Sequence, residues 1–276
     1  MSFADSKQRF SSRVADYVRY RPGYPPLLVA LLARECDLRV EHVIADVGSG
    51  TGLLSKLFLA NGNRVMGVEP NAGMRAAGDE FLAEYGNYSS VDGSAESTTL
   101  DDSSVDFVVA GQAFHWFEPV ATRQEFLRIL KPGGWAAMVW NDRRTGETPF
   151  GRGYEDLLLR YGTDYSRVKD AYPEAQQMES FFGAGNCRKR ELDNFQEFDF
   201  AGLAGRLRSS SYAPQEGHLN YSPMMAALRG LFAAHHTSGR VRMEYTTQIY
   251  FGRLAQRGQA LGPSLGPPAN DVRDAG

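Results

Sequence analysis

The sequence predicts an α/β protein built on a doubly wound, mostly parallel sheet. Short apolar runs alternate with amphipathic segments over the first half of the chain, a pattern typical of strands that helices cover on both faces. A glycine-rich turn also follows the first apolar run directly, as in folds that bind a ligand where a strand leads into a helix. The expected strands of this half are residues 43–47, 65–69, 88–91, 106–110 and 135–140.

Helices fill the intervals between these strands. Pro25 and Pro26 open a helix that runs through Leu32, since proline is tolerated in a first helical turn. Asn71 is a good cap for a helix reaching about residue 85. The other two helices of this half are expected at residues 52–59 and 118–130, the second stopped by the Pro-Gly-Gly segment at 132–134.

The alternation stops after Trp140. Helices are expected at 153–161, 166–182, 200–209 and 223–236, and strands at 190–198 and 242–251. We therefore predict one domain over residues 1–255, made of an arm (1–22), a cofactor-binding core (23–140) and a helical cap with the last strands (141–255). Residues 256–276 are rich in glycine, proline and alanine without periodicity, which predicts a disordered tail.

Composition excludes several classes of function. The chain has 276 residues, 42% of them hydrophobic, and a net charge of −3, whereas a nucleic-acid surface usually carries a basic excess. Its two cysteines have no metal-ligand spacing, so neither a zinc site nor a disulfide framework is expected. No apolar run is long enough for a membrane span, and the first residues lack a signal-peptide profile. We expect a cytoplasmic protein without a membrane or nucleic-acid partner, and the sequence does not indicate its oligomeric state.

The glycine-rich turn, Asp46-Val47-Gly48-Ser49-Gly50-Thr51-Gly52, indicates which ligand is bound. A dinucleotide fingerprint needs glycine at position 53, where Leu53 stands. The Asp46 carboxylate repels a pyrophosphate and attracts an ammonium group. Glu69 ends the second strand, where an acid usually holds ribose hydroxyls. A ribose, a cationic amino acid end and no phosphate describe S-adenosylmethionine; the alternatives are a structural glycine turn and a nicotinamide or flavin site.

The motifs together resemble those of class I S-adenosylmethionine-dependent methyltransferases. The turn resembles the family's first motif, and four further segments follow in the family's order: Glu69–Asn71, Gly93–Glu96, Ser104–Phe117 and Leu127–Gly134. The segment Tyr20–Pro25 resembles one that precedes the core in the small-molecule, type 11 branch that includes trans-aconitate methyltransferases. The likeness is good over about residues 10–140 and loose beyond. It implies a Rossmann-like sheet of seven strands.

The expected cofactor contacts combine the residue patterns with this resemblance. Gly48, Ser49, Gly50 and Gly52 let the backbone approach the ligand, Asp46 takes its amino group, and Glu69 takes both ribose hydroxyls. Pro70 and Met74 are expected against the adenine face, and Gln112 at the methionine moiety. Ser94, Ala95 and Glu96 are expected to bound the adenine edge; relatives often carry Asp at the position of Ser94, which leaves the exact contact open.

Two residues have open roles in the chemistry. His115 is either a general base toward a hydroxyl or amine, or a wall of the pocket beside Trp116. An ionised acceptor such as a carboxylate needs no base, and we favour the wall. Arg21 is either a clamp for a carboxylate of the substrate or cofactor, or an arginine of a surface loop.

We therefore predict methyl transfer to a small-molecule acceptor, through a carboxylate or hydroxyl oxygen. Residues 141–236 are expected to form a cap over the carboxyl ends of the strands, lined by the aromatics Tyr154, Tyr161, Tyr165, Tyr172, Phe181 and Phe182, with Tyr17, Tyr20 and Arg21 closing the other side. The segment 111–114 lacks the carbonyl acceptors that base-modifying methyltransferases carry there, and Asn141-Asp142 alone is too little for a metal site. A non-catalytic cofactor-binding protein and a nicotinamide oxidoreductase remain as alternatives.

Overall fold

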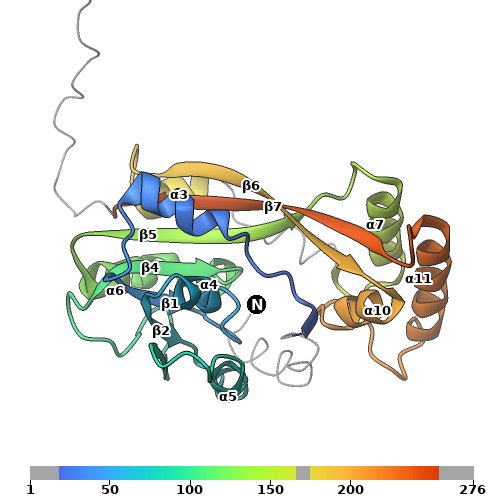
Figure 1. The fold of residues 1–276 in the computed structure, drawn as a ribbon, viewed down its shortest axis with the longest axis horizontal. Helices are drawn as coiled ribbons and strands as arrows, with labels where there is room; N and C mark the ends of the chain where they lie inside the picture. Colours follow the sequence, from blue (N-terminus) through green and yellow to red (C-terminus); the bar gives the residue numbers. More distant parts are fainter. Residues whose placement is uncertain (1–18, 166–174, 255–276) are drawn as a thin grey trace, which may run out of the picture.

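The computed structural model describes residues 19–165 and 175–254. Within these ranges one seven-stranded sheet forms the centre of the fold, with the strand order β3-β2-β1-β4-β5-β7-β6 (Figure 1). All neighbours are parallel except at β7, which is antiparallel to both β5 and β6. The predicted doubly wound, mostly parallel sheet is confirmed. The strands are β1 (Val43–Val47), β2 (Arg64–Val68), β3 (Tyr88–Val91), β4 (Val105–Gly111), β5 (Leu130–Arg143), β6 (Arg188–Phe198) and β7 (Val241–Gly252).

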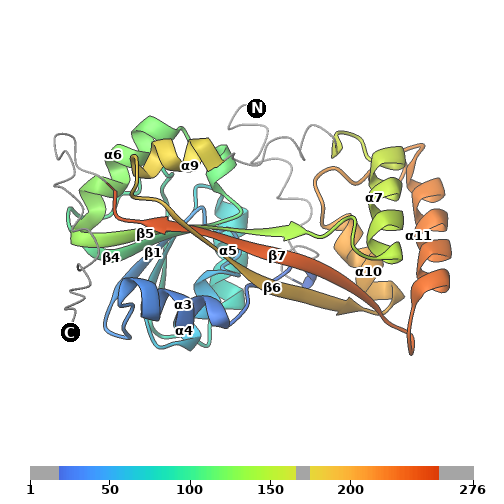
Figure 2. The ribbon, with the colours of Figure 1, turned by 90° about the horizontal axis from the view of Figure 1, so that it is seen from above.

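Helices cover both faces of the sheet (Figure 2). One face carries α3 (Leu27–Cys36) and α4 (Ser55–Ala60), whose Leu28, Leu32 and Phe58 are fully buried. The other face carries α6 (Pro119–Ile129) and α9 (Ala175–Phe182). The remaining elements are α5 (Ala72–Phe81), η1 (Phe114–Trp116), α7 (Pro149–Tyr161), α10 (Phe200–Arg208) and α11 (Tyr221–His235).

Side-chain caps fix where several helices begin. The predicted cap at Asn71 is present, since its side chain accepts from the Gly73 and Met74 amides at the start of α5. Glu118 does the same for α6, and Asp199 for α10. α4 begins only at Ser55, three residues later than expected, because Gly52 has a φ of +81° and the chain is still turning there.

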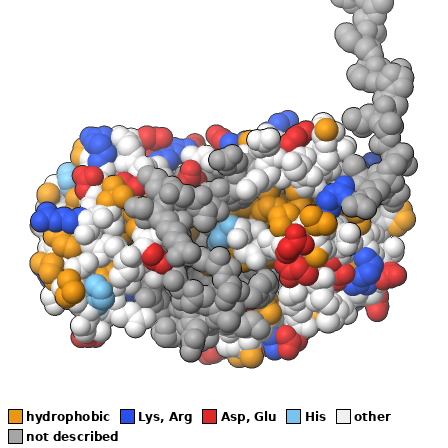
Figure 3. All heavy atoms as spheres, turned by 180° about the vertical axis from the view of Figure 1, so that it is seen from behind, with side chains coloured by type: hydrophobic (Ala, Val, Ile, Leu, Met, Phe, Trp, Pro, Cys, Tyr) orange, Lys and Arg blue, Asp and Glu red, His pale blue; other side chains and the backbone are white. Residues whose placement is uncertain are grey.

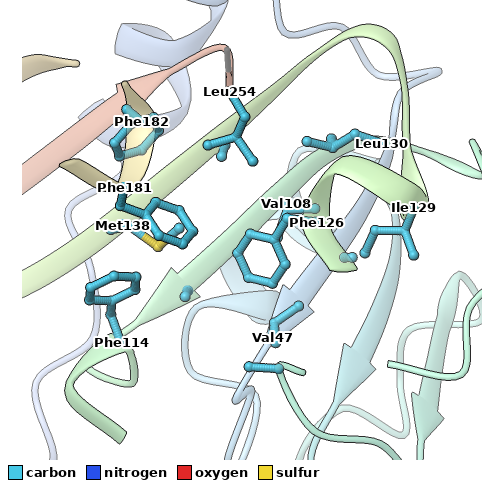
Figure 4. Packing of buried hydrophobic residues seen from close by; sticks show 14 of the residues in the cluster. Val47, Val108, Phe114, Phe126, Ile129, Leu130, Met138, Phe181, Phe182 and Leu254 are labelled. Atoms are coloured by element: carbon cyan, nitrogen blue, oxygen red, sulfur yellow. The ribbon is translucent and has the colours of Figure 1, made fainter. Parts of the chain in front are cut away.

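The hydrophobic core beneath α6 and α9 joins four parts of the chain (Figure 4). Val108 and Met138 of the sheet lie under Phe126 of α6 and Phe181 of α9. Phe181 and Phe182 are 3% and 0% exposed, and the Phe181 ring lies 4.8 Å from that of Phe114, centroid to centroid. The expectation that these two phenylalanines line an acceptor pocket is therefore wrong: they are core residues of the sheet.

The last three strands extend past the rest of the sheet. β5 continues three residues beyond its expected end at Trp140, because Arg143 still pairs with Tyr245 of β7. The helices α7, α10 and α11 pack against the amino-terminal half of β7, over Val241, Met243 and Tyr245 (Figures 1 and 2). We call these three helices and the strand ends beneath them the cap. It lies beyond the carboxyl end of β4 and is partly β-structure rather than purely helical.

Candidate active site

The glycine-rich turn leaves β1 at the carboxyl edge of the sheet. The Gly48 and Ser49 amides both donate to the Val68 carbonyl, at 2.8 and 3.1 Å, which joins the turn to the end of β2. Gly48, Gly50 and Gly52 all have positive φ, a conformation that glycine adopts without steric cost.

The three glycines are needed for different reasons. A Cβ on Gly48 would lie 2.7 Å from Ala113 Cβ, and one on Gly52 would overlap Leu82 Cδ1. A Cβ on Gly50 would meet only Met74 Cε, at 3.4 Å. All three glycines are predicted from the sequence to allow close approach of the ligand. In the structure, packing explains Gly48 and Gly52, and Gly50 is the most open position of the turn.

Asp46 is fully buried at the base of this turn. Ser55 Oγ donates to Asp46 Oδ2 at 2.6 Å, whereas Asp46 Oδ1 is buried and has no hydrogen-bond partner within residues 19–165 and 175–254. Burial raises the pKa of Asp46 to about 7, and the Ser55 hydrogen bonds oppose the rise. An unpartnered carboxylate oxygen with this pKa is the group that a cationic donor would stabilise. Ser55 was not singled out in the sequence, although a serine soon after a glycine turn was a usable signal.

Glu69 follows β2 and faces the same turn. Its Oε2 accepts from the Gly50 amide at 3.1 Å, and its Oε1 accepts from the Asn71 amide at 2.9 Å. The carboxylate is therefore held beside Gly50, where the strands β1 and β2 end next to each other. Pro70 is partly exposed, and Met74, 5% exposed, lies over Gly50 from the first turn of α5.

The loop after β3 forms the next part of the edge. Ser94 and Ser97 exchange backbone hydrogen bonds, which fold residues 94–97 into a tight turn. Ala95 is buried in the core of the sheet, at 3% exposure, so its side chain has a packing role. The Glu96 carboxylate accepts from the Glu118 amide at 2.9 Å and so supports the start of α6.

The segment after β4 completes the edge. Gln112 has a φ of +56°, and its Nε2 donates to the Asn141 carbonyl at 3.1 Å. His115 lies in η1, with its ring centroid 4.8 Å from that of Trp116. Burial lowers the pKa of His115 to about 4, so the imidazole is neutral at physiological pH.

Arg21 lies at the cap rather than at the glycine turn. Its Nη2 donates to the Ser209 carbonyl at the end of α10, at 3.0 Å, and Tyr20 packs against Gly205 of the same helix. Asn141 and Asn194 both donate to the Gly23 carbonyl, at 3.1 and 2.8 Å. The segment before α3 thus runs from the cap to the sheet (Figure 1). Tyr17 and Tyr172 lie outside the described residues.

Asn141 organises this junction and was missed as a positioning residue. Besides donating to Gly23, it accepts at Oδ1 from Thr247 Oγ1 at 2.6 Å and from Asn194 Nδ2 at 3.0 Å. It is 3% exposed. The available signal was a polar residue placed directly after the apolar run that ends at Trp140.

The described part of the chain contains no cluster of three or more metal-ligating side chains and no helix long and apolar enough to cross a membrane. Acidic and basic side chains are intermixed over the face seen in Figure 3. Cys36 and Cys187 are both free thiols.

Comparisons with known proteins agree with this arrangement. Residues 45–138 match the sequence model of a family described as a methyltransferase domain. Over these residues the chain is therefore similar to a methyltransferase domain. An uncharacterised methyltransferase of Mycobacterium tuberculosis is 37% identical over 139 residues, which are 50% of this chain and 54% of that protein. One from Schizosaccharomyces pombe is 34% identical over 135 residues, 49% of this chain and 53% of the relative. The matches thus span about half the length of these curated relatives.

Solved structures of methyltransferases share the fold. A candidate type II methyltransferase from Anaeromyxobacter dehalogenans superposes with a TM-score of 0.64 at 21% identity, over 85% of this chain and 98% of that one. A candidate methyltransferase from an antibiotic biosynthesis pathway of Anabaena variabilis superposes with a TM-score of 0.56 at 19% identity, over 86% of this chain and all of the other. At these identities the likeness concerns the fold alone.

Proposed function

We propose that this protein binds S-adenosylmethionine at the carboxyl edge of β1, β2 and β4 and transfers its methyl group to a small-molecule acceptor. The observation that carries the proposal is the fully buried Oδ1 of Asp46 at the base of the glycine turn, which no described residue partners. A buried carboxylate oxygen without a donor is costly, and an ammonium group relieves that cost by hydrogen bonding and by charge.

The other residues of the edge fit the rest of the cofactor. The Glu69 carboxylate stands beside Gly50 at the end of β2, the position from which an acid usually accepts hydrogen bonds from two ribose hydroxyls. Pro70 and Met74 would meet the adenine face, Ser94, Ala95 and Glu96 its edge, and Gln112 the methionine moiety. A dinucleotide fits less well, because Asp46 repels a pyrophosphate and Leu53 replaces the glycine that its turn needs.

When bound, the cofactor supplies a methyl group on a sulfonium, an electrophile that needs no further activation. The protein's contribution is then to align the acceptor and to exclude water, since proximity and orientation can contribute several kcal/mol to a displacement. We propose a carboxylate or hydroxyl oxygen as the nucleophile. His115 forms a wall in this scheme, because an imidazole whose pKa is lowered to about 4 is a weak proton acceptor.

A transfer assay tests the proposal. The full-length protein would be incubated with methyl-labelled S-adenosylmethionine and panels of small carboxylic acids, phenols and alcohols. Label should enter at least one acceptor with the wild type and with the control Asp106→Asn, which alters an aspartate at the amino end of β4. Label should not enter any acceptor with Asp46→Asn. Cofactor binding without transfer to any acceptor would favour a non-catalytic binding protein instead.

A further inference from the structure

The cap holds two buried arginines that the proposed cofactor site does not use. Arg206 of α10 is 5% exposed, and the side chain of Arg143, at the end of β5, is 10% exposed. Arg143 lies with its guanidinium 4.9 Å from the ring centre of Tyr154 and donates to Tyr165 Oη at 2.7 Å. Arg206 donates to Tyr245 Oη at 3.3 Å and to Ser210 Oγ at 2.9 Å.

Two polar atoms of this cluster have no hydrogen-bond partner among the described residues. They are Arg143 Nε and Tyr154 Oη, both buried, and Tyr154 is 1% exposed. A buried donor without a hydrogen-bond acceptor destabilises the fold, and a charged donor does so more strongly than a neutral one. A purely structural network would be expected to satisfy both. Two such donors in one cluster indicate that a bound ligand supplies the missing hydrogen-bond acceptor.

The charge of the cluster also favours an anionic ligand. Among the described residues, Glu155 is the carboxylate that pairs with Arg143, at 2.5 Å, while Arg206 has neutral partners. Burial by itself raises the pKa of Tyr212, yet the guanidiniums of Arg206, Arg143 and Arg21 lower it overall. The described charges of the cluster, two guanidiniums and one carboxylate, therefore sum to a positive charge.

We propose that Arg143, Arg206 and Tyr154 form an anion subsite in the cap that anchors a carboxylate of the acceptor, with the methylated atom at the acceptor's other end. A carboxylate matches the planar guanidinium and the single phenol donor. The apolar residues that surround the cluster, including Phe150, Leu157 and Leu203, suit an aromatic or aliphatic body. This inference rests on the proposed methyl transfer.

The length of β5 separates the proposed carboxylate anchor in the cap from the place where the methyl group would be transferred. Val139 is level with Gly111, the last residue of β4, and so with the edge where the cofactor is placed. Arg143 stands four residues farther, about 13 Å along an extended strand. Arg143 donates hydrogen bonds to Glu155, which lies in α7, and to Tyr165, which follows α7, so its guanidinium lies inside the cap. An anion held there is remote from the donor methyl, and pairing with guanidinium also lowers its nucleophilicity.

Binding of model acids to the full-length protein tests the subsite without turnover. Phenylacetate and hexanoate would be titrated by calorimetry beside their neutral amides, phenylacetamide and hexanamide. We expect each acid to bind at least tenfold more tightly than its amide. Tyr154→Phe should weaken acid binding roughly fivefold to thirtyfold, whereas Tyr250→Phe, whose hydroxyl is paired with Gln248 outside the cluster, should leave it unchanged. Tyr154→Phe removes a hydroxyl that has no hydrogen-bond partner in the described part of the chain, so the fold should be retained.

A second variant tests the sign of the charge. Glu155→Gln removes the carboxylate that competes for Arg143, so acid binding should tighten. Acids that bind no better than amides, or equal affinities for wild type and Tyr154→Phe, would overturn the subsite. S-adenosylhomocysteine is titrated into the same samples: its binding without acid binding refutes the subsite alone, and acid binding without it refutes the proposed cofactor.

Discussion

Proton release on cofactor binding is the most specific consequence of the buried Asp46. With its pKa raised to about 7 by burial, this carboxyl is about nine-tenths protonated at pH 6. An ammonium group placed beside the carboxylate favours the ionised form, so binding should release about 0.9 proton at pH 6. At pH 8 the carboxyl supplies only about 0.1 proton, while an α-amino group with a pKa of about 8 takes up roughly half a proton, so the net release should disappear. The α-amino group of the cofactor is already protonated at pH 6.

The same shift makes stability depend on pH. The pKa of Asp46 in the folded state lies above its ordinary value of 3.8, so stability from this group is present below about pH 4 and is lost as pH rises toward 7. The shift corresponds to about 4 kcal/mol at most. Asp46→Asn should remove this part of the pH dependence in chemical denaturation of the ligand-free protein.

Calorimetry in two buffers of different ionisation enthalpy measures the released proton directly. The wild type and the control Asp106→Asn should both release this proton. Burial alone raises the pKa of Asp106, but hydrogen bonds from Lys131 and Val43 lower it overall, so Asp106 is ionised at pH 6 and has no proton to contribute. Asp46→Asn should release none. Equal release from wild type and Asp46→Asn, or none from either, would refute the role assigned to this carboxylate.

Three further predictions concern other residues of the edge. Glu69→Ala loses charge-assisted hydrogen bonds to the ribose, so cofactor affinity should fall about tenfold or more by calorimetry while circular dichroism stays native; an unchanged dissociation constant contradicts the assignment. Gly52→Ala combines a φ of +81° with overlap on Leu82 and should cost about 2–5 kcal/mol in denaturation, whereas Gly86→Ala, with open space, should cost under about 1 kcal/mol; equal costs would refute the packing role. His115→Gln should lower turnover only modestly, and the wild-type rate should show no limb from His115 between pH 5 and 9 because the pKa is lowered to about 4; a loss of 10²-fold or more would identify a base.

Local patterns predicted the parallel half of the fold well. β1 and β3 lie at the expected residues, because a buried parallel strand is a short apolar run whose ends are marked by turn residues. Asn71 could be placed as a cap because capping depends on residues within one helical turn.

Features that depend on distant partners were missed. β5 was expected to begin at Trp135 and end at Trp140, yet it runs from Leu130 to Arg143, since its far end is paired with β7 a hundred residues later. Phe181 and Phe182 were placed in the cap because an amphipathic helix does not reveal which core it joins. The arginines of the cap were overlooked for the same reason: they come from β5 and α10 and meet only in the folded chain.

Binding of S-adenosylhomocysteine, measured against NADH by calorimetry on the full-length protein, tests the central claim most directly. The fit of Asp46, Gly50 and Glu69 predicts heat from S-adenosylhomocysteine with a stoichiometry of about one, and none from NADH. Tight binding of NADH, with no heat from S-adenosylhomocysteine or S-adenosylmethionine, would contradict the cofactor assignment and the methyl transfer that depends on it.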